Sequence, residues 1–263
     1  MYKILIIFAV LPFIYTPPVD ALVINSAGVV VTEDFSGFGG AGLSSEPSTG
    51  QLDSDDWRIS GLSDGSGRFG GTYITGDFAR GTSASGVSGG GVWGFDVDNG
   101  PAINRALGVQ PIGSDFTPGE ITLRLMNDTA STVTSLLVAY DVYVFNDASR
   151  ASLFNFSYSL NDSTYIDVTS ADLISVEGAA TNPEWEQNSR SFTLSGLNLL
   201  DASQFYLRWS GDDVSGSGSR DQFALDNVSI TGYSVVAASV PEPETWVLMT
   251  IGIVMLNLRR LRH

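Results

Sequence analysis

The chain has no cysteine among its 263 residues, which excludes disulfides, thiol catalysis and thiolate metal sites. Its single histidine is the last residue, His263. The body of the chain therefore cannot form a Ser-His-Asp triad, a histidine general base or a histidine-ligated zinc site. An enzyme built from this sequence would have to work mainly with carboxylates.

Lysine is almost as scarce, because Lys3 is the only one. Between residues 22 and 239 the sequence carries 26 acidic residues against nine arginines, a net charge of −17. Such a body repels nucleic acid and anionic membrane surfaces rather than binding them. The acidic excess favours solubility and is compatible with the binding of cations.

The first residues have the layout of a secretory signal peptide. Lys3 supplies a positive start, residues 4–15 are mostly apolar, and residues 19–21 (Val-Asp-Ala) put small side chains where a signal peptidase cleaves. Prolines within and after the apolar stretch would interrupt a helix that stayed in the membrane. We therefore expect residues 1–21 to be a signal peptide that is cleaved after Ala21, with the mature chain beginning at Leu22.

The C-terminal tail, residues 236–263, combines three elements in a fixed order. A proline-containing extended segment comes first, then the apolar run 245–258, then a cluster of arginines. The run can enter a bilayer as a short transmembrane helix, although its roughly 20 Å, at about 1.5 Å per residue, is less than the ~30 Å hydrocarbon layer. The arginines would hold its far end on the cytoplasmic side. The residues of the first and third elements are Val240, Pro241, Glu242 and Pro243, and Arg259, Arg260 and Arg262.

This order of elements resembles the PEP-CTERM sorting signal of exported bacterial proteins. The resemblance implies that an exosortase in the inner membrane recognises residues 240–243, cleaves near them and releases the body to the cell surface or the extracellular polysaccharide matrix. Until then the tail would hold the chain in the inner membrane with the body outside. The tail thus predicts a route and a destination, and it leaves the activity of the body open.

Between the two ends, residues 22–235 show strands joined by glycine-rich turns. Alternation is clearest in residues 120–126, where Ile121, Leu123 and Leu125 share one face. Such runs, with turns about every ten residues, predict an all-β domain, a two-sheet antiparallel sandwich of the jelly-roll kind. The expected strands are 29–35, 57–60, 72–78, 91–95, 120–126, 133–145, 153–160, 191–197, 205–209 and 222–230.

The closing stretch of the body carries a second resemblance. Residues 222–230 read Gln-Phe-Ala-Leu-Asp-Asn-Val-Ser-Ile, and residues 33–35 read Glu-Asp-Phe. They resemble the closing and opening strands of jelly-roll domains of the carbohydrate-binding-module and MAM-like type. In those modules the matching aspartate often binds a structural calcium ion, so the resemblance implies a calcium site of Asp226 with Glu33 or Asp34. The alternative is that Asp226 caps a turn or faces solvent.

Other carboxylates give weaker signals. Residues 53–56 (Asp-Ser-Asp-Asp) lack the glycine and the distal glutamate of an EF-hand loop, so we interpret Asp53, Asp55 and Asp56 as a solvated loop. Three more carboxylates flank a glycine–serine loop and either join the calcium site or remain loop residues: Asp212, Asp213 and Asp221.

Glu184 and Glu186 form the best carboxylate pair for a glycosidase, because retaining enzymes need two carboxyls about 5–5.5 Å apart. Residues i and i+2 of a strand share a face, but residues 181–188 have the composition of a loop. The pair therefore supports only an alternative function, a carboxylate-dependent glycoside hydrolase or lyase on the same sandwich.

Trp57 and Trp185 stand near polar segments and are the candidates for stacking on sugar rings, with packing in the core as the competing role. Together with the tail, these features predict a non-catalytic protein of the cell surface or extracellular matrix that binds polysaccharide and is stabilised by calcium. A plain spacer without a ligand is a further alternative.

Overall fold

The computed structural model describes residues 22–234. The signal peptide and the sorting tail lie outside the described residues, so both stay predictions. Residues 22–234 form strands and two short 3₁₀ turns, and within this range no helix has the length and apolar character needed to cross a membrane. The prediction of an all-β sandwich is confirmed.

One of the two large sheets has six strands in the order β1-β9-β14-β11-β12, with β5 beside β9. Its pairs are antiparallel except that β1 runs parallel to β9. Because β14 takes one edge of β9, β1 and β5 share the other edge, one after the other. The strands are β1 (Leu22–Ile24), β5 (Trp57–Ser60), β9 (Gly119–Asn127), β11 (Arg150–Ser159), β12 (Ile166–Asp167) and β14 (Gln204–Gly216).

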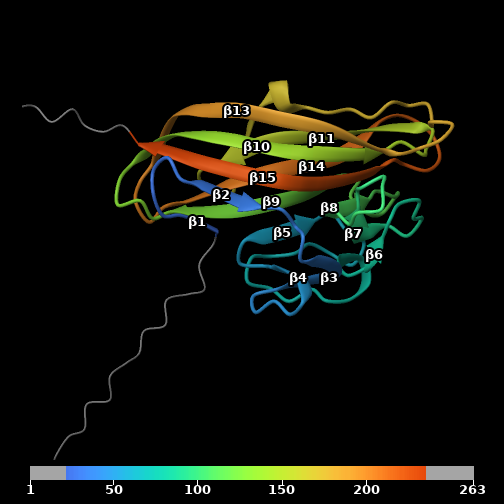
Figure 1. Ribbon diagram of the computed structural model, residues 1–263, viewed down its shortest axis with the longest axis horizontal. Coiled ribbons are helices and arrows are strands. Elements are labelled where there is room, and N and C mark those ends of the chain that lie inside the picture. Colours follow the sequence, from blue (N-terminus) through green and yellow to red (C-terminus); the bar gives the residue numbers. More distant parts are fainter. Residues whose placement is uncertain (1–21, 235–263) are drawn as a thin grey trace, which may run out of the picture.

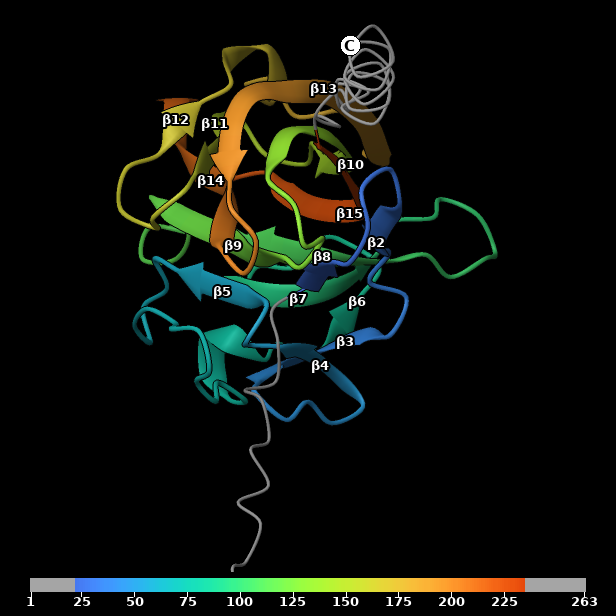
Figure 2. The ribbon, with the colours of Figure 1, turned by 90° about the vertical axis from the view of Figure 1, so that its left-hand side faces the viewer.

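The second large sheet has seven strands in the order β13-β10-β15-β8-β7-β6, with β2 beside β15. It is antiparallel except for the β6–β7 pair. The two sheets lie face to face, as the views along and across the strands show (Figures 1 and 2). The strands are β2 (Val30–Glu33), β6 (Thr82–Ser83), β7 (Gly91–Asp96), β8 (Arg105–Gln110), β10 (Val133–Phe145), β13 (Trp185–Leu199) and β15 (Gln222–Ser234).

A small parallel pair, β3 (Phe38–Ser44) and β4 (Gly50–Asp53), forms a third sheet below the sandwich in Figure 1. The strand predicted over residues 72–78 is wrong. Tyr73 makes only an isolated bridge to Leu43, and the 3₁₀ turn η1 (Gly76–Phe78) follows. Gly76 has a φ of 61°, a conformation that L side chains rarely adopt, and it turns the chain where the strand would have continued.

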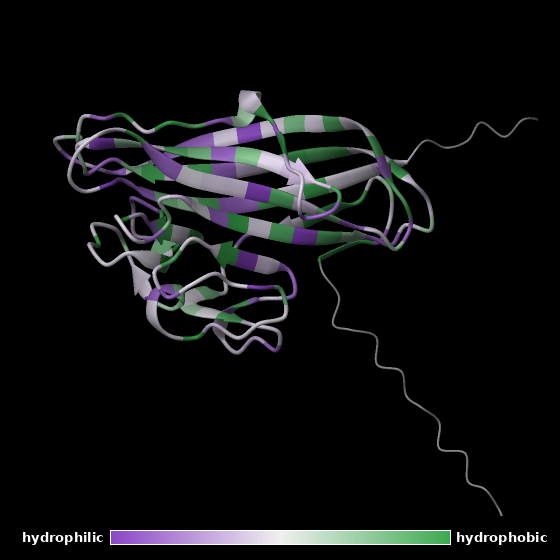
Figure 3. Ribbon diagram, turned by 180° about the vertical axis from the view of Figure 1, so that it is seen from behind, coloured by the Kyte–Doolittle hydropathy of each residue, from purple (hydrophilic) through white to green (hydrophobic). Residues whose placement is uncertain are grey.

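The core lies between the two large sheets, and the alternation read from the sequence places its residues. Phe205, Leu207 and Trp209 are at most 2% exposed, and the strands show alternating bands of hydropathy in Figure 3. The break in the closing strand is a β-bulge at Asn227, whose φ is 51° and where the register with β10 shifts. The bulge lets residues on both sides of it face the core.

Candidate functional site

The outer face of the six-stranded sheet carries rows of polar side chains that run across its strands. On β9, Ile121, Leu123 and Leu125 are fully buried, so the residues between them point away from the core. The strand register aligns Arg58, Thr122, Arg208, Ser157 and Asp167 in one row. The rows beside it are Ser60, Glu120, Ser210 and Asn155, and Arg124, Tyr206 and Ser159. We call these residues, together with Phe69, Asp162 and Tyr165 that contact them, the polar face.

Three of the nine arginines of the body lie on the polar face, each against an aromatic ring. The guanidinium carbon of Arg208 is 3.6 Å from the ring centroid of Tyr165. Those of Arg58 and Arg124 are 4.6 and 4.7 Å from the ring of Phe69. Such cation–π contacts contribute about 0.5–2 kcal/mol each, and here they fix both the rings and the planar guanidinium groups.

Carboxylates hold the arginines in place. Asp162 accepts two hydrogen bonds from the guanidinium of Arg58, at 2.6 and 2.7 Å, and one from the hydroxyl of Tyr165 at 2.6 Å. Glu120 accepts a hydrogen bond from Nη1 of Arg208 at 2.8 Å. Burial by itself would raise the pKa of Asp162, but the hydrogen bonds from Arg58 and Tyr165 outweigh it and lower that pKa. The four charged side chains keep between 19% and 36% of their surface exposed, so a ligand can reach them.

The two phenols of the polar face stay neutral. Burial, followed by the hydrogen bond to Asp162, raises the pKa of Tyr165. Burial and the charge of Asp162 also raise the pKa of Tyr206, whose ring lies 5.9 Å from that of Phe69. The hydroxyl of Tyr206 donates to the side-chain oxygen of Gln204 at 3.1 Å. The polar face therefore presents uncharged tyrosine rings beside guanidinium groups and carboxyl groups.

A cavity of about 330 Å³ continues the polar face at the level of Asn155 and Ser210. Asp167, Asp172 and Asp212 also line it, and the side-chain oxygen of Asn155 is buried without a hydrogen-bond partner among the described residues. The row through Arg58 meets the cavity at Asp167, which belongs to both, while Thr122 and Ser157 of the row are buried beneath longer side chains. At ~4.8 Å per strand, the row spans roughly 19 Å from β5 to β12.

The two tryptophans expected to stack on sugars are buried. Trp57 is 1% exposed and packs in the core, 5.1 Å from Phe35 and 6.2 Å from Trp209 between ring centroids. Trp185 is 6% exposed and donates its indole N–H to the carbonyl of Ala84 at 2.7 Å. Neither ring presents a free face, because the sheet interior covers one and a small aromatic cluster with Phe95 and Phe145 holds the other. The prediction of sugar stacking is therefore wrong for both.

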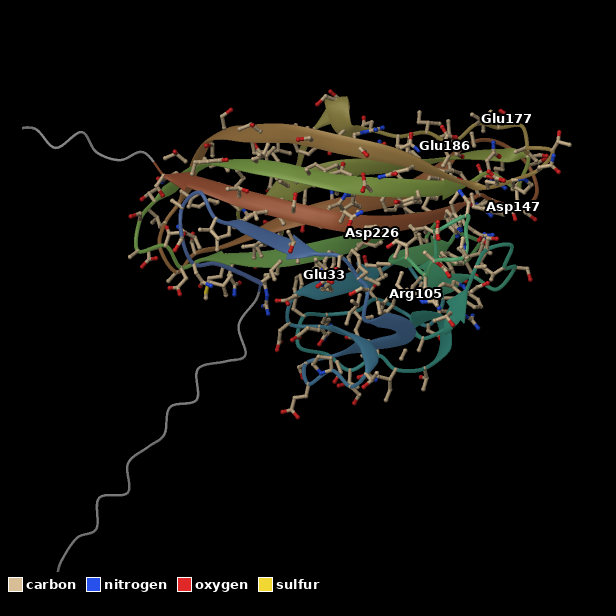
Figure 4. All side chains as sticks on the ribbon, in the orientation of Figure 1. Glu33, Arg105, Asp147, Glu177, Glu186 and Asp226 are labelled. Atoms are coloured by element: carbon tan, nitrogen blue, oxygen red, sulfur yellow. The ribbon has the colours of Figure 1, made fainter. Side chains whose placement is uncertain are left out.

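The residues of the predicted calcium site do not converge on an ion. Glu33 and Asp226 lie on the neighbouring strands β2 and β15 (Figure 4). The buried carboxylate of Asp226 accepts hydrogen bonds from the backbone N–H of Asn227 at 2.7 Å and from the amide of Asn104 at 3.0 Å. Asp34 is exposed and caps the N–H of Ser36. Over residues 22–234 no three carboxylates are arranged to hold a metal. Calcium binding stays a prediction, but the ligand set on which the prediction was based is not formed.

The remaining predicted carboxylates have structural surroundings. Glu184 and Glu186 are exposed on either side of Trp185. β13 begins at Trp185, three residues before the predicted loop would end at Asn188. Figure 4 shows Glu186 on this edge strand, which belongs to the seven-stranded sheet, whereas the polar face belongs to the six-stranded one.

The three carboxylates beside the glycine–serine loop do not form a metal site among the described residues either. They are Asp212, Asp213 and Asp221. Asp213 forms ion pairs with Arg150 and Arg220, and Asp212 lines the cavity beside the polar face. Asp221 is fully buried and accepts the N–H of Ala148 at 3.1 Å.

The loop at residues 53–56 is not simply solvated. Asp55 accepts, through its backbone carbonyl, a hydrogen bond from Arg124 at 2.8 Å. Burial, followed by the charge of Asp53, raises the pKa of Asp56 to about 7. The interpretation as a solvated loop is thus wrong for Asp56.

A second cavity, of about 550 Å³, opens at one end of the sandwich between the end of β8 at Gln110 and loops that contain Asp147 and Arg220. No aromatic side chain lines it, and Arg220 donates to both carboxylate oxygens of Asp213. The polar face has aromatic rings and partly exposed guanidinium groups, so it is better suited to bind a ligand than this cavity.

No protein-family model and no curated protein matches this chain. Solved structures resemble it only distantly. The CBM22-1 xylan-binding domain of Xyn10C from Paenibacillus barcinonensis is 11% identical, with a TM-score of 0.35 over 80% of this chain and 97% of that domain. The K2 adhesin domain of Lys-gingipain is 14% identical, with a TM-score of 0.38 over 77% and 97%. Tailspike protein 4 of bacteriophage CBA120 is 11% identical, with a TM-score of 0.35 over 68% of this chain and 20% of the tailspike chain. The functional argument therefore rests on the geometry of the polar face.

Sequence reasoning did not identify the polar face. The only sign of the polar face in the sequence was that polar residues alternate with apolar ones in two predicted strands. This alternation puts Arg124 and Arg208 on the side opposite the core residues. Phe69 sits in a glycine-rich loop and Tyr165 beside a two-residue strand, so neither has a periodic context. Only the fold brings these rings against the arginines.

Proposed function

We propose that this chain is an exported, non-catalytic protein of the bacterial cell surface or extracellular matrix, and that it binds polysaccharide through the polar face. The observation that carries the proposal is the cross-strand row of Arg58, Thr122, Arg208, Ser157 and Asp167 with aromatic rings fixed above it.

The chemistry of the polar face matches that of a polysaccharide. The apolar side of a sugar ring packs on an aromatic face, and pairs of neighbouring hydroxyls match the planar forks of Arg208 and Arg58 and the carboxylates of Glu120 and Asp162. Arg58 and Arg208 are already paired with these carboxylates, and Arg124 lies 3.8 Å from Asp55, so each arginine of the face has a carboxylate beside it. A neutral polysaccharide fits this balance better than an acidic one.

The non-catalytic part of the proposal rests on where the carboxylates lie. Glu186 on β13 and Glu184 just before it are exposed at the edge of the seven-stranded sheet, away from the rings of the six-stranded sheet. On the polar face itself, Glu120 and Asp162 are engaged by Arg208 and Arg58, whereas a hydrolase would need a carboxyl pair free to act on the bound sugar.

Export and sorting are supported by the sequence of the two ends. Residues 1–21 supply a signal peptide and residues 240–243 the segment that an exosortase would recognise. We propose cleavage after Ala21 in the first step, transient anchoring of the tail in the inner membrane, and release at the surface. Deletion of residues 236–263 should change the distribution of the protein between membrane, surface and medium; an unchanged distribution would contradict the sorting proposal.

The binding proposal is tested on a glycan array with the mature chain, Leu22 to His263, in mild detergent. Tyr206→Ala removes a ring of the polar face, and Tyr233→Ala removes an exposed tyrosine of the seven-stranded sheet as the matched control. Because stacking on one aromatic ring contributes about 1 kcal/mol, we expect a roughly five-fold or greater loss for Tyr206→Ala and none for Tyr233→Ala. Silence of the array, or equal loss in both variants, would overturn glycan binding by this face.

A further inference from the structure

The mature N-terminus lies at a junction between two strands. Along one edge of β9, β5 pairs with residues 120–123 and β1 pairs with residues 125–127. Between them, the N–H of Arg124 donates to the backbone carbonyl of Asp56 at 2.7 Å. Leu22, the first residue of β1, therefore follows Asp56 directly along this edge, as the positions of β1 and β5 below β9 show in Figure 1.

The carboxyl group of Asp56 faces the backbone nitrogen of Leu22 and accepts its N–H. Its Oδ1 atom is buried and has no hydrogen-bond partner among the described residues. Asp53 and Asp55 add negative charge beside it, and the guanidinium of Arg124 lies 3.8 Å from Asp55. One carboxylate oxygen of Asp56 is thus left without the donor that a buried anion needs.

The charges around this position are unbalanced. Glu33, Asp53 and Asp56 line one cavity of about 160 Å³, with Asp55 next in sequence, and Arg124 is the cation that acts on Asp56 there. A second positive charge at the nitrogen of Leu22 would reduce the imbalance. Because this nitrogen belongs to the backbone, it can carry a positive charge only as a free α-amino group.

We propose that cleavage of the signal peptide after Ala21 creates a buried ion pair between the new α-ammonium group of Leu22 and the carboxylate of Asp56. The inference rests on the proposed processing. Hydrolysis of the Ala21–Leu22 peptide bond adds the hydroxyl of water to the carbonyl of Ala21 and a proton to the nitrogen of Leu22. Since an α-amino group has a pKa of about 7.7–8.0, it takes up a further proton at neutral pH.

Cleavage thereby changes the nitrogen from a neutral donor with one hydrogen into a cation with three. The same group can then donate to Oδ1 of Asp56 and neutralise its charge. The side chain of Leu22 packs against the core, and β1 is held by β9, so the ammonium group is positioned before the pair forms. The mature body is stabilised at the step at which it is exported.

The effect has a defined pH window. Without the ammonium group, the raised pKa of Asp56 means that its contribution to stability is full below the unfolded pKa and is lost as pH rises through the folded one. The pair restores stability while Asp56 is ionised and Leu22 is protonated. The benefit should therefore be largest near pH 7, and it should shrink below about pH 4 and once the pH rises past the pKa of the α-ammonium group, about 8 in an unperturbed chain. The other charged groups that face this position are the same before and after cleavage. They are Glu33, Asp53, Asp55 and Arg124.

The test compares the chain from Leu22 to His263 with a chain that retains Ala21, both in mild detergent. The extra alanine keeps an ammonium group but moves it one residue from Asp56. We expect the chain that begins at Leu22 to melt about 5 °C higher at pH 7 by near-UV circular dichroism. Asp56→Asn should remove the difference, and Asp55→Asn, which leaves the contact with Leu22 intact, should keep it.

Equal melting temperatures at pH 7, or a difference that persists in Asp56→Asn, would overturn the pairing. N-terminal sequencing of the exported protein should identify Leu22 as the first residue. Another first residue would overturn the claim that the ion pair forms in the exported protein. The experiment uses no glycan, so its failure is distinct from a failure of polysaccharide binding.

Discussion

Replacement of Asp226 by asparagine should stabilise the protein at neutral pH. The carboxylate is fully buried, and burial raises its pKa from 3.8 to about 6, with the charges of Asp141 and Asp34 adding to the effect. The oxygen of an asparagine amide can accept the N–H of Asn227 in place of Oδ1. Its NH2 group can then donate to the oxygen of Asn104 once the amide of Asn104 has turned by 180°.

The magnitude follows from linkage. A shift of about two units at ~1.4 kcal/mol per unit gives about 3 kcal/mol as an upper bound. Because the folded-state pKa is raised, the contribution of Asp226 to stability is full below pH ~4 and is lost as pH rises through about 6. Asp226→Asn should therefore match the wild type near pH 4 and exceed it by up to about 3 kcal/mol at pH 7.

Urea unfolding of both proteins between pH 4 and 8 measures this difference. Asp226→Asn should show a flatter dependence of the unfolding free energy on pH. A variant that is less stable than the wild type at pH 7 would refute the reasoning.

Repeating the series with about 1 mM Ca²⁺ and with a chelator tests the calcium prediction in the same experiment. A site filled at roughly 100 times its dissociation constant adds about 2.7 kcal/mol. If Asp226 were a ligand, Ca²⁺ would stabilise the wild type and the substitution would remove that gain.

Three further substitutions test other parts of the account. Trp57→Ala should cost about 3–5 kcal/mol, because the ring is buried in the core, and should lower the melting temperature by about 10 °C. Arg208→Gln should weaken polysaccharide binding at least five-fold in calorimetric titrations, since it breaks the contact with Glu120. It should lower the unfolding free energy by about 1–3 kcal/mol, because the ion pair and the cation–π contact with Tyr165 are both lost. Glu184→Gln should leave binding unchanged, and the wild type should release no reducing sugar from bound polysaccharide; hydrolysis lost in this variant would support the enzyme instead.

The core and most strands could be predicted from the sequence because they depend on alternation within one segment. The bounds of β10 and β5 agree with the prediction, and the inward faces of β9, β14 and β15 were correctly placed. Residues 72–78 failed because apolar content was read as a strand, whereas Gly76 turns the backbone there. The start of β13 at Trp185 was missed because its polar residues take their place by pairing with β10, which a local pattern does not reveal.

The candidate site could not be predicted in the same way. Tryptophans were chosen because they lie near polar segments, yet Trp57 directly follows the polar loop 53–56 and still faces the core. The polar face depends instead on register across five strands and on Phe69 and Tyr165, which reach it from loops. Non-local contacts of this kind leave no period in the sequence.

The central claim, that the polar face holds a polysaccharide, is tested most directly by hydroxyl-radical footprinting of tyrosines with and without the glycan that binds best on the array. The account predicts that Tyr165 and Tyr206 become protected while Tyr233, on the other sheet, reacts as before. Protection of Tyr233, or unchanged reaction of Tyr165 and Tyr206 at a saturating glycan concentration, would contradict it.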